Sequence, residues 1–181
     1  FGEEYTLVAV ADHITGKKPG NSVSNLSSTR ALADVTIKNG GKYYASAVGE
    51  VNVVEMMKEK NAVIGGEGNG GVIYPELHYG RDALVGIALF LTYLANKKLK
   101  MSELKSSFPQ YTISKNKLAL TNTTNIDLLL EKISNKYKTV KQNKIDGLKL
   151  EFKNEWVHMR KSNTEPIIRI YAESQNQKSA H

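Results

Sequence analysis

Residues 22–64 read SVSNLSSTRALADVTIKNGGKYYASAVGEVNVVEMMKEKNAVI, and this stretch decides the fold class. Apolar spacing predicts, in order, a strand at 22–26, a helix at 30–38, a strand at 43–48, a helix at 51–60 and a strand at 62–64. Serines before the first helix suit an N-cap, and an Asn-Gly-Gly run ends that helix. This alternation predicts an α/β domain with a mixed, largely parallel sheet and helices.

A glycine-rich segment follows the last of these strands. Residues 65–71 read Gly-Gly-Glu-Gly-Asn-Gly-Gly. Ligands of α/β sheets bind at the carboxyl ends of strands, and glycines let a backbone approach a ligand closely. Glu67 and Asn69 carry the only side chains of this loop, and a carboxylate and an amide suit sugar hydroxyls. A flexible surface turn is the alternative, and the spacing matches neither a dinucleotide-binding fingerprint nor a P-loop.

Two further helices flank this region. Helical spacing predicts them at 3–14 and 83–95. The first begins almost at the start of the chain, which suggests a fragment cut at a domain boundary. In the second, the apolar residues in register are Leu84, Ile87, Ala88, Leu91 and Leu94.

The loop before the second of these helices contains His78, Arg81 and Asp82. Arg81 is a candidate ligand contact, and the alternative is an ion pair with Asp82 at the start of the helix. His78 could face a ligand, but a lone histidine on a loop is more often solvated.

A domain boundary is expected near residue 107, after the basic residues 96–100 and beside Pro109. We expect 1–106 to form the α/β domain and 107–181 to form a smaller α+β domain with an antiparallel sheet. The elements predicted around and after the boundary are a short helix at 101–108, a helix at 125–137 and strands at 110–120, 139–140, 148–152, 156–159 and 168–173. Residues 174–181 are predicted to be a frayed polar tail.

Charge is unevenly distributed along the chain. The net charge is +7; residues 1–105 hold 12 Lys/Arg and 11 Asp/Glu, and residues 106–181 hold the remaining 13 and 7. A basic second half suits an anionic ligand such as a sugar phosphate or a nucleic acid, although solvated lysines are also common. The absence of cysteine excludes disulfides and thiolate metal sites and agrees with a cytoplasmic location. No apolar run is long enough to span a bilayer, and the acidic first residues do not resemble a signal peptide.

The second half contains a donor-rich segment, Arg160-Lys161-Ser162-Asn163-Thr164-Glu165-Pro166-Ile167-Ile168-Arg169. Arginine offers a planar fork that matches phosphate oxygens. Hydroxyl and amide side chains add neutral donors, and backbone N–H groups of a tight turn can form an anion nest. Apolar runs on both sides predict strand, loop, strand. The alternative is a polar turn between two surface strands.

The pattern Arg-x-Ser-Asn-Thr-Glu-Pro-x-x-Arg resembles the phosphate-binding loop of the α-D-phosphohexomutase family. Residues 65–71 resemble the sugar-binding loop of that family, usually Gly-Glu-x-Ser-Gly-His, with Asn69 at the Ser position and Gly71 at the His position. Asp82 matches the Asp that leads into the long helix. Because the sugar-binding loop departs from the usual pattern, the identity of the sugar stays open.

The resemblance implies domains three and four of a four-domain enzyme that moves phosphate between O6 and O1 of a hexose or hexosamine through a 1,6-bisphosphate. It implies that the phosphoserine and the Mg²⁺ loop belong to missing N-terminal domains, so the fragment alone should be inactive. The residues expected to grip the non-reacting phosphate are Arg160, Ser162, Asn163, Thr164 and Arg169. The residues expected to hold the sugar are Glu67, Asn69 and Arg81.

Glucosamine 6-phosphate is the first expected substrate, with mannose and glucose phosphates as the alternative. No Ser-His-Asp set and no metal-ligand spacing is evident. Two other classes remain: a nucleic-acid-binding module, although aromatics do not interleave with the lysines, and a non-catalytic interaction domain. Nucleic acid and membrane are not expected as partners.

Overall fold

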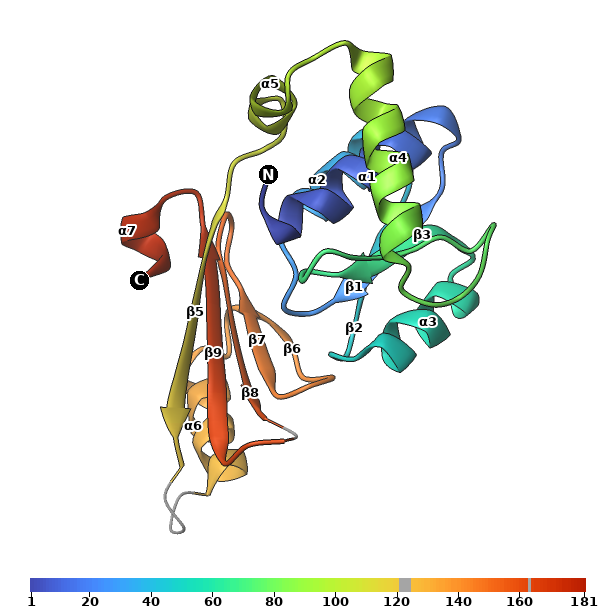
Figure 1. Ribbon diagram of the computed structural model, residues 1–181. Coiled ribbons are helices and arrows are strands. Elements are labelled where there is room, and N and C mark those ends of the chain that lie inside the picture. Colours follow the sequence, from blue (N-terminus) through green and yellow to red (C-terminus); the bar gives the residue numbers. More distant parts are fainter. Residues whose placement is uncertain (121–124, 163) are drawn as a thin grey trace. The chain divides into compact units, whose positions relative to one another are not determined.

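The structure is a computed structural model that describes residues 1–120, 125–162 and 164–181. It divides into two compact units, Phe1–Gln110 and Tyr111–His181, which we call unit 1 and unit 2. Each unit contains its own sheet (Figure 1).

Unit 1 is an α/β domain with a mixed sheet. Its elements are α1 (Glu3–Lys17), β1 (Asn21–Asn25), α2 (Ala31–Lys38), β2 (Tyr43–Ser46), α3 (Glu50–Glu59), β3 (Ala62–Glu67), β4 (Gly71–Ile73), α4 (Ala83–Lys97) and α5 (Met101–Ser106). The strand order is β2-β1-β3-β4; the first three strands are parallel and β4 is antiparallel to β3. The predicted fold class of this part is therefore confirmed.

Helices cover both faces of the unit 1 sheet, with α1 on one side and α3 on the other (Figure 1). The two adjacent glycines of β3 face these two helices in turn. A Cβ on Gly65 would lie 2.3 Å from Met57 Sδ in α3, whereas a Cβ on Gly66 would lie 3.1 Å from a methyl carbon of Leu7 in α1. The core between the sheet and α3 consists of Val23, Val53, Met57, Ala62 and Ile73. Helix α1 is buried on nearly all sides because α2 and α4 pack against it.

The apolar stripe expected on α4 is not the face that packs. Leu84, Ile87 and Leu91 are exposed, with relative exposures of 79%, 55% and 53%. The buried residues of α4 are Gly86, Phe90 and Tyr93. Helix α4 is apolar nearly all round, so spacing alone does not select a face. The buried face is selected by the close approach of Gly86 to Val72 of β4, because a Cβ on Gly86 would lie 3.2 Å from a Val72 methyl carbon.

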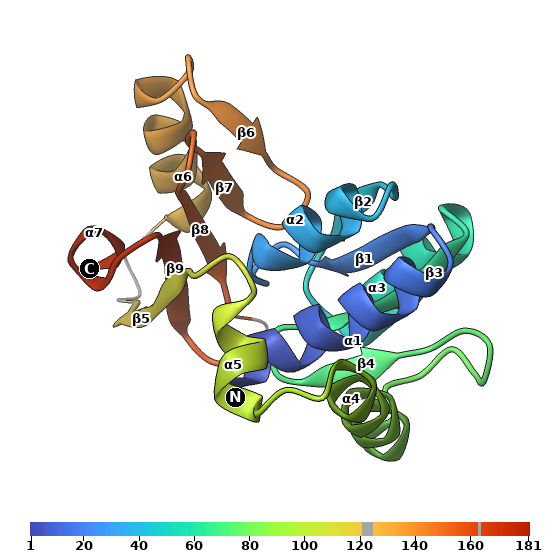
Figure 2. The same cartoon turned by 90° about the horizontal axis from the view of Figure 1, so that it is seen from above.

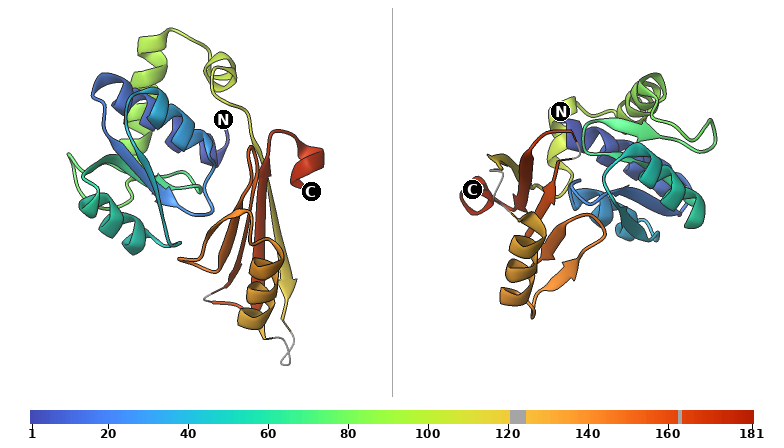
Figure 3. Two further views of the ribbon diagram at one scale, coloured as in Figure 1. Left: turned by 180° about the vertical axis from the view of Figure 1, so that it is seen from behind. Right: turned by 90° about the horizontal axis from the view of Figure 1, so that it is seen from below.

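Unit 2 is an α+β domain with an antiparallel sheet, as predicted. Its elements are β5 (Thr112–Ala119), α6 (Ile126–Lys136), β6 (Lys141–Asn143), β7 (Leu148–Glu151), β8 (Trp156–Lys161), β9 (Ile167–Ser174) and α7 (Gln177–Ala180). The strand order is β5-β9-β8-β7-β6. Helix α6 lies along one face of the sheet (Figure 2 and Figure 3). The core there consists of Ile126, Leu148, Leu150, Met159 and Ile168.

The C-terminal residues differ from the frayed tail that the sequence predicted. They form α7, where Asn176 Oδ1 accepts a hydrogen bond from Ser179 N at 2.9 Å and Ala180 is buried. An N-cap and one buried apolar residue are sufficient to order this short helix. Across the described ranges, no helix is both long enough and apolar enough to cross a membrane.

We predict that Gly65→Ala destabilises the protein by about 1–3 kcal/mol, because the interior cannot expand around a new methyl group. The new Cβ would lie 2.9 Å from the Val23 carbonyl oxygen, a backbone atom of the paired strand, as well as against Met57. Thermal and urea unfolding followed by circular dichroism measures the change.

The matched control is Gly16→Ala in the exposed last turn of α1, where the nearest atom would be Asn39 Nδ2 at 3.8 Å. Alanine there should stabilise the helix by about 0.5–1 kcal/mol. Equal unfolding midpoints for Gly65→Ala and the parent would contradict the close packing of β3.

Candidate phosphate and sugar sites

Strands β8 and β9 place two arginines directly opposite each other. Arg160 faces Arg169 in the antiparallel register. Their sequence neighbours Met159 and Ile168 belong to the core beneath α6, and side chains alternate along a strand. Both arginines therefore lie on the sheet face away from α6. Like charges directly opposite in a sheet repel, and a bound anion would relieve that repulsion.

The two guanidinium groups differ in how they are paired. Arg169 Nη2 lies 2.7 Å from Glu165 Oε2. Arg160 Nη1 donates a long hydrogen bond, 3.4 Å, to the Lys161 carbonyl oxygen. Arg160 Nε is buried and has no hydrogen-bond partner among the described residues. A buried donor without an acceptor is costly, so Arg160 is the better prepared of the two to receive a ligand oxygen.

The loop between β8 and β9 contributes fewer backbone donors than the sequence suggested. Ser162 is buried, and its N–H donates to the Ile167 carbonyl oxygen at 3.0 Å, so this amide is not available to an anion nest. Thr164 is exposed, and its N–H lies 3.5 Å from Ser162 Oγ. Asn163 lies outside the described residues. The donors that remain are mainly side chains.

His158 lies on the same sheet face as Arg160, in the adjacent row, and adds no charge to it. It is fully buried in β8, and its Nε2 lies 2.7 Å from the Asp146 carbonyl oxygen. Burial lowers the pKa of His158 to about 4, and the nearby cations Lys149 and Arg160 act in the same direction. The ring is therefore neutral near pH 7.

Glu67 lies at the carboxyl end of β3, and its side chain is largely buried. Its Oε1 accepts a hydrogen bond from Asn25 Nδ2 at 2.9 Å, and its Oε2 lies 3.1 Å from Arg81 Nη1. Asn25 ends the neighbouring parallel strand, β1, so both groups lie at the carboxyl edge of the sheet. Two partners compensate the buried carboxylate. The sequence analysis missed Asn25, although its place at the end of a predicted strand was a usable signal.

Arg81 joins two carboxylates from different elements. Besides Glu67, it contacts Glu50. The backbone N–H of Arg81 donates to Glu50 Oε1 at 3.0 Å, and its Nε donates to Glu50 Oε2 at 2.8 Å. These hydrogen bonds from Arg81 lower the pKa of Glu50. The alternative of an ion pair between Arg81 and Asp82 is wrong.

Asp82 instead caps α4, where its Oδ1 accepts from Val85 N at 3.0 Å. His78 is exposed, as expected for a loop histidine, and its Nε2 also lies 3.0 Å from Asp82 Oδ2.

The glycine-rich loop is anchored at one point to the segment after β1. Gly68 N donates to Ser28 Oγ at 3.0 Å. Asn69 is at the exposed tip, where its Oδ1 accepts from Gly71 N at 3.1 Å. Because its oxygen is used by its own turn, Asn69 offers a ligand mainly its NH₂ group.

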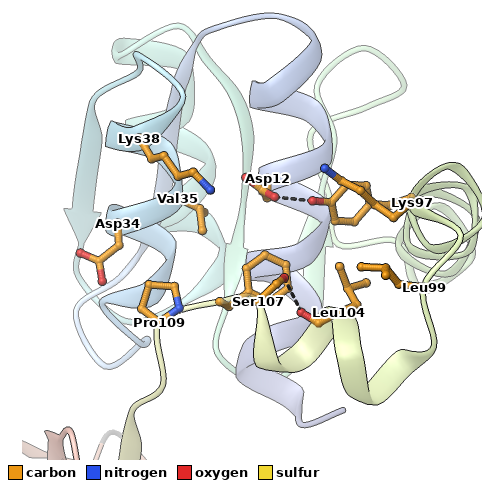
Figure 4. Close-up of a pocket in the computed structure, with 11 residues that line it drawn as sticks. Asp12, Asp34, Val35, Lys38, Lys97, Leu99, Leu104, Ser107 and Pro109 are labelled. Carbon is orange, nitrogen blue, oxygen red and sulfur yellow. Dashed lines mark hydrogen bonds between the residues drawn. The ribbon is translucent and has the colours of Figure 1, made fainter.

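A separate cavity of about 200 Å³ in unit 1 contains none of the expected site residues (Figure 4). Lys38 and Lys97 point toward Asp12 from opposite sides of it. Asp12 accepts hydrogen bonds from Asn39 Nδ2, at 2.8 Å, and from the Tyr93 hydroxyl. Lys38 ends α2 and precedes β2, so this cavity lies at the amino edge of the sheet, opposite Glu67. Among the described residues, no group of three or more His, Cys, Asp or Glu could hold a metal ion.

Two family models match the chain. The model of phosphoglucomutase/phosphomannomutase alpha/beta/alpha domain III matches residues 2–111, and the C-terminal domain model of the same family matches residues 120–181. The chain belongs to the phosphoglucomutase/phosphomannomutase family.

Several members of the phosphoglucomutase/phosphomannomutase family resemble the chain over most of its length. A phosphoglucomutase/phosphomannomutase of Thermococcus kodakarensis is 34% identical over 97% of this chain and 39% of its own length. A phosphoglucosamine/phosphogalactosamine mutase of Sulfurisphaera tokodaii is 35% identical over 88% of this chain and 35% of its own length. The chain thus spans less than half the length of these curated relatives.

Solved structures of the phosphoglucomutase/phosphomannomutase family share the fold. A member from Burkholderia thailandensis has a TM-score of 0.79 at 23% identity and covers 98% of this chain and 38% of its own. An N-acetylphosphoglucosamine mutase of Aspergillus fumigatus, in complex with GlcNAc-6P and magnesium, has a TM-score of 0.64 at 12% identity and covers 98% of this chain and 44% of its own.

We predict that His158 makes unit 2 sensitive to mild acid. Its folded-state pKa lies below the ordinary value, so between pH 6.5 and about 4 the unfolded chain binds the proton more strongly and stability falls as the pH falls. From pH 7 to pH 5 this histidine should cost about 2 kcal/mol of stability. His158→Gln keeps a donor for Asp146 and should show a smaller loss.

Urea unfolding at the two pH values, followed by the fluorescence of Trp156, tests this. Trp156 is the single tryptophan and lies buried in β8, so it reports on unit 2. The same loss of stability in the parent and in His158→Gln would contradict the assignment.

Proposed function

We propose that this chain is the sugar- and phosphate-binding half of a phosphohexose mutase. In this proposal unit 2 grips the phosphate that is not reacting, and unit 1 binds the sugar hydroxyls. The complete enzyme would move phosphate between O6 and O1 of a hexose or hexosamine through a 1,6-bisphosphate. We place the phosphoserine and the Mg²⁺ site in domains that this chain does not span, so the chain alone should not turn over substrate.

The observation that carries the proposal is the pair of arginines held opposite each other on β8 and β9. Two guanidinium groups on one sheet face provide bidentate donors for a phosphate dianion. Ser162 and Thr164 lie just beyond Arg160 and add hydroxyl groups. We include Asn163 in this clamp from the sequence motif. Arg169 would exchange its contact with Glu165 for one with the ligand, since a phosphate dianion is the stronger acceptor.

For the sugar, the proposal rests on Glu67 and Asn69. Glu67 has a fixed position and charge, and each carboxylate oxygen can accept more than one hydrogen bond. Asn69 adds an exposed NH₂ donor at the tip of the same loop. Arg81 lies next to Glu67 and acts mainly to position it. Glucosamine 6-phosphate is the preferred substrate in this proposal, and the similarity to the phosphoglucosamine/phosphogalactosamine mutase of Sulfurisphaera tokodaii supports it. Mannose and glucose phosphates are the alternative.

We predict that Arg160→Ala weakens binding of inorganic phosphate and hexose 6-phosphates by about tenfold to a hundredfold, as expected for a lost charge-assisted hydrogen bond. Calorimetric or NMR titration of this chain measures it. Lys161→Ala is the matched control, because Lys161 lies in the same strand on the opposite sheet face and its loss removes the same charge. Equal effects of the two substitutions would reduce the site to nonspecific attraction and would refute the clamp.

We predict that Glu67→Gln changes the ranking of sugars but not the affinity for inorganic phosphate. Loss of the carboxylate charge should weaken the binding of glucosamine 6-phosphate by about fivefold to tenfold relative to the binding of inorganic phosphate. The experiment compares glucosamine, glucose and mannose 6-phosphates by the same titration. Glu55→Gln, at an exposed position of α3, is the control. If Glu67→Gln leaves the affinity of each sugar phosphate relative to inorganic phosphate unchanged, the loop does not select the sugar.

A further inference from the structure

A third cation lies in line with the two arginines. The β5–β9 register pairs Thr112 with Ser174 at one end and Ala119 with Ile167 at the other. Within this register Lys117 is directly opposite Arg169, which is itself opposite Arg160. Residues opposite each other share a sheet face, so one row of the sheet carries three cations from three strands.

Charge changes along this face from row to row. The row next to the cations contains Lys115, Tyr171, His158 and Lys149, and the row after that contains Ile113, Glu173, Trp156 and Glu151. Carboxylates thus gather two rows away from the arginines. Segregated charge strengthens the local field. Positive charge is therefore concentrated in the two rows nearest the loop that follows β8.

Lys117 is available to a ligand in a way that Arg169 is not. It is exposed and forms no ion pair within the part of the chain that the structure describes. Arg169, in contrast, is paired with Glu165. Three cations and one carboxylate leave this group of residues with a net charge of +2, which matches a phosphate monoester dianion.

A glycine leaves the other end of the row open. Leu148 of β7 is opposite Met159, so Gly147 falls beside Arg160. A Cβ on Gly147 would lie 2.8 Å from Arg160 Cα and 2.2 Å from the Met159 carbonyl oxygen, and its φ of +70° also favours glycine. No side chain from this position covers Arg160.

We propose that Lys117 is a third phosphate-binding cation, and that the row Lys117–Arg169–Arg160 selects dianionic phosphate monoesters over monoanionic esters. This inference rests on the proposed function of unit 2. The arginines supply planar, directional donors, whereas a lysine is a point charge on a flexible stem. Lys117 therefore responds to the charge of the ligand more than to its shape.

The test compares methyl phosphate with dimethyl phosphate at pH 8, where the first is a dianion because its second pKa is about 6 and the second is a monoanion. The parent chain should bind methyl phosphate at least about tenfold more tightly, as expected for a site with excess positive charge. Lys117→Ala should weaken the binding of methyl phosphate by about fivefold, since the lysine is exposed to solvent. The affinity for dimethyl phosphate should change less, and Lys117→Arg should restore the preference for methyl phosphate. Lys161→Ala, on the other sheet face, should leave the preference unchanged.

The outcomes separate this inference from the function it rests on. If Lys117→Ala keeps the parent's affinity and preference while Arg160→Ala loses binding, the phosphate clamp stands and the role of Lys117 is refuted. If neither substitution affects binding, the clamp itself is refuted. If Lys117→Ala weakens both esters equally, Lys117 provides general attraction only and the proposed selectivity is wrong.

Discussion

The hydrogen-bond ladder between β8 and β9 fixes the positions of the charges on one face of unit 2. It holds Arg160 and Arg169 at opposite positions, where their charges repel and cannot separate without breaking the sheet. The cost is offset by the apolar core beneath α6, which is buried whether or not an anion is present. In the proposed function, a phosphate would meet cations that the sheet already holds in place, so little free energy would be lost in ordering them.

Unit 1 presents the opposite case, since it holds a carboxylate side chain in a largely buried position. Arg81 supports Glu67 on one oxygen and Asn25 supports it on the other. Glu50 in turn holds the guanidinium from the side. A carboxylate fixed in this way keeps its orientation and retains lone pairs for a sugar hydroxyl. In the proposed function, the two units would therefore carry complementary sites, a cationic one that suits phosphate and an anionic one that suits hydroxyl donors.

Features determined by local pattern were predictable from the sequence, and features determined by long-range register were not. The strand and helix order of residues 22–64 could be predicted because each element carries its own spacing and end signals. The buried face of α4 could not, because that helix is apolar nearly all round. One partner of Arg81 is Glu50, 31 residues away, and the alignment of Lys117 with Arg169 appears only once β5 is paired with β9. The clamp role of Asn163 stays a prediction from the motif.

The division of labour between the units follows from what each contact can distinguish. In the proposed function, every hexose phosphate would present the same dianion to Arg160 and Arg169, so the clamp would stabilise all of them equally and contribute nothing to choosing among them. For the same reason, either phosphate of a hexose bisphosphate could occupy the clamp. Discrimination must then come from contacts with hydroxyl or amino groups at Glu67 and Asn69. One or two hydrogen bonds at a loop edge supply about 1–3 kcal/mol, so under the proposed function this chain should rank sugars modestly while it binds their phosphate firmly.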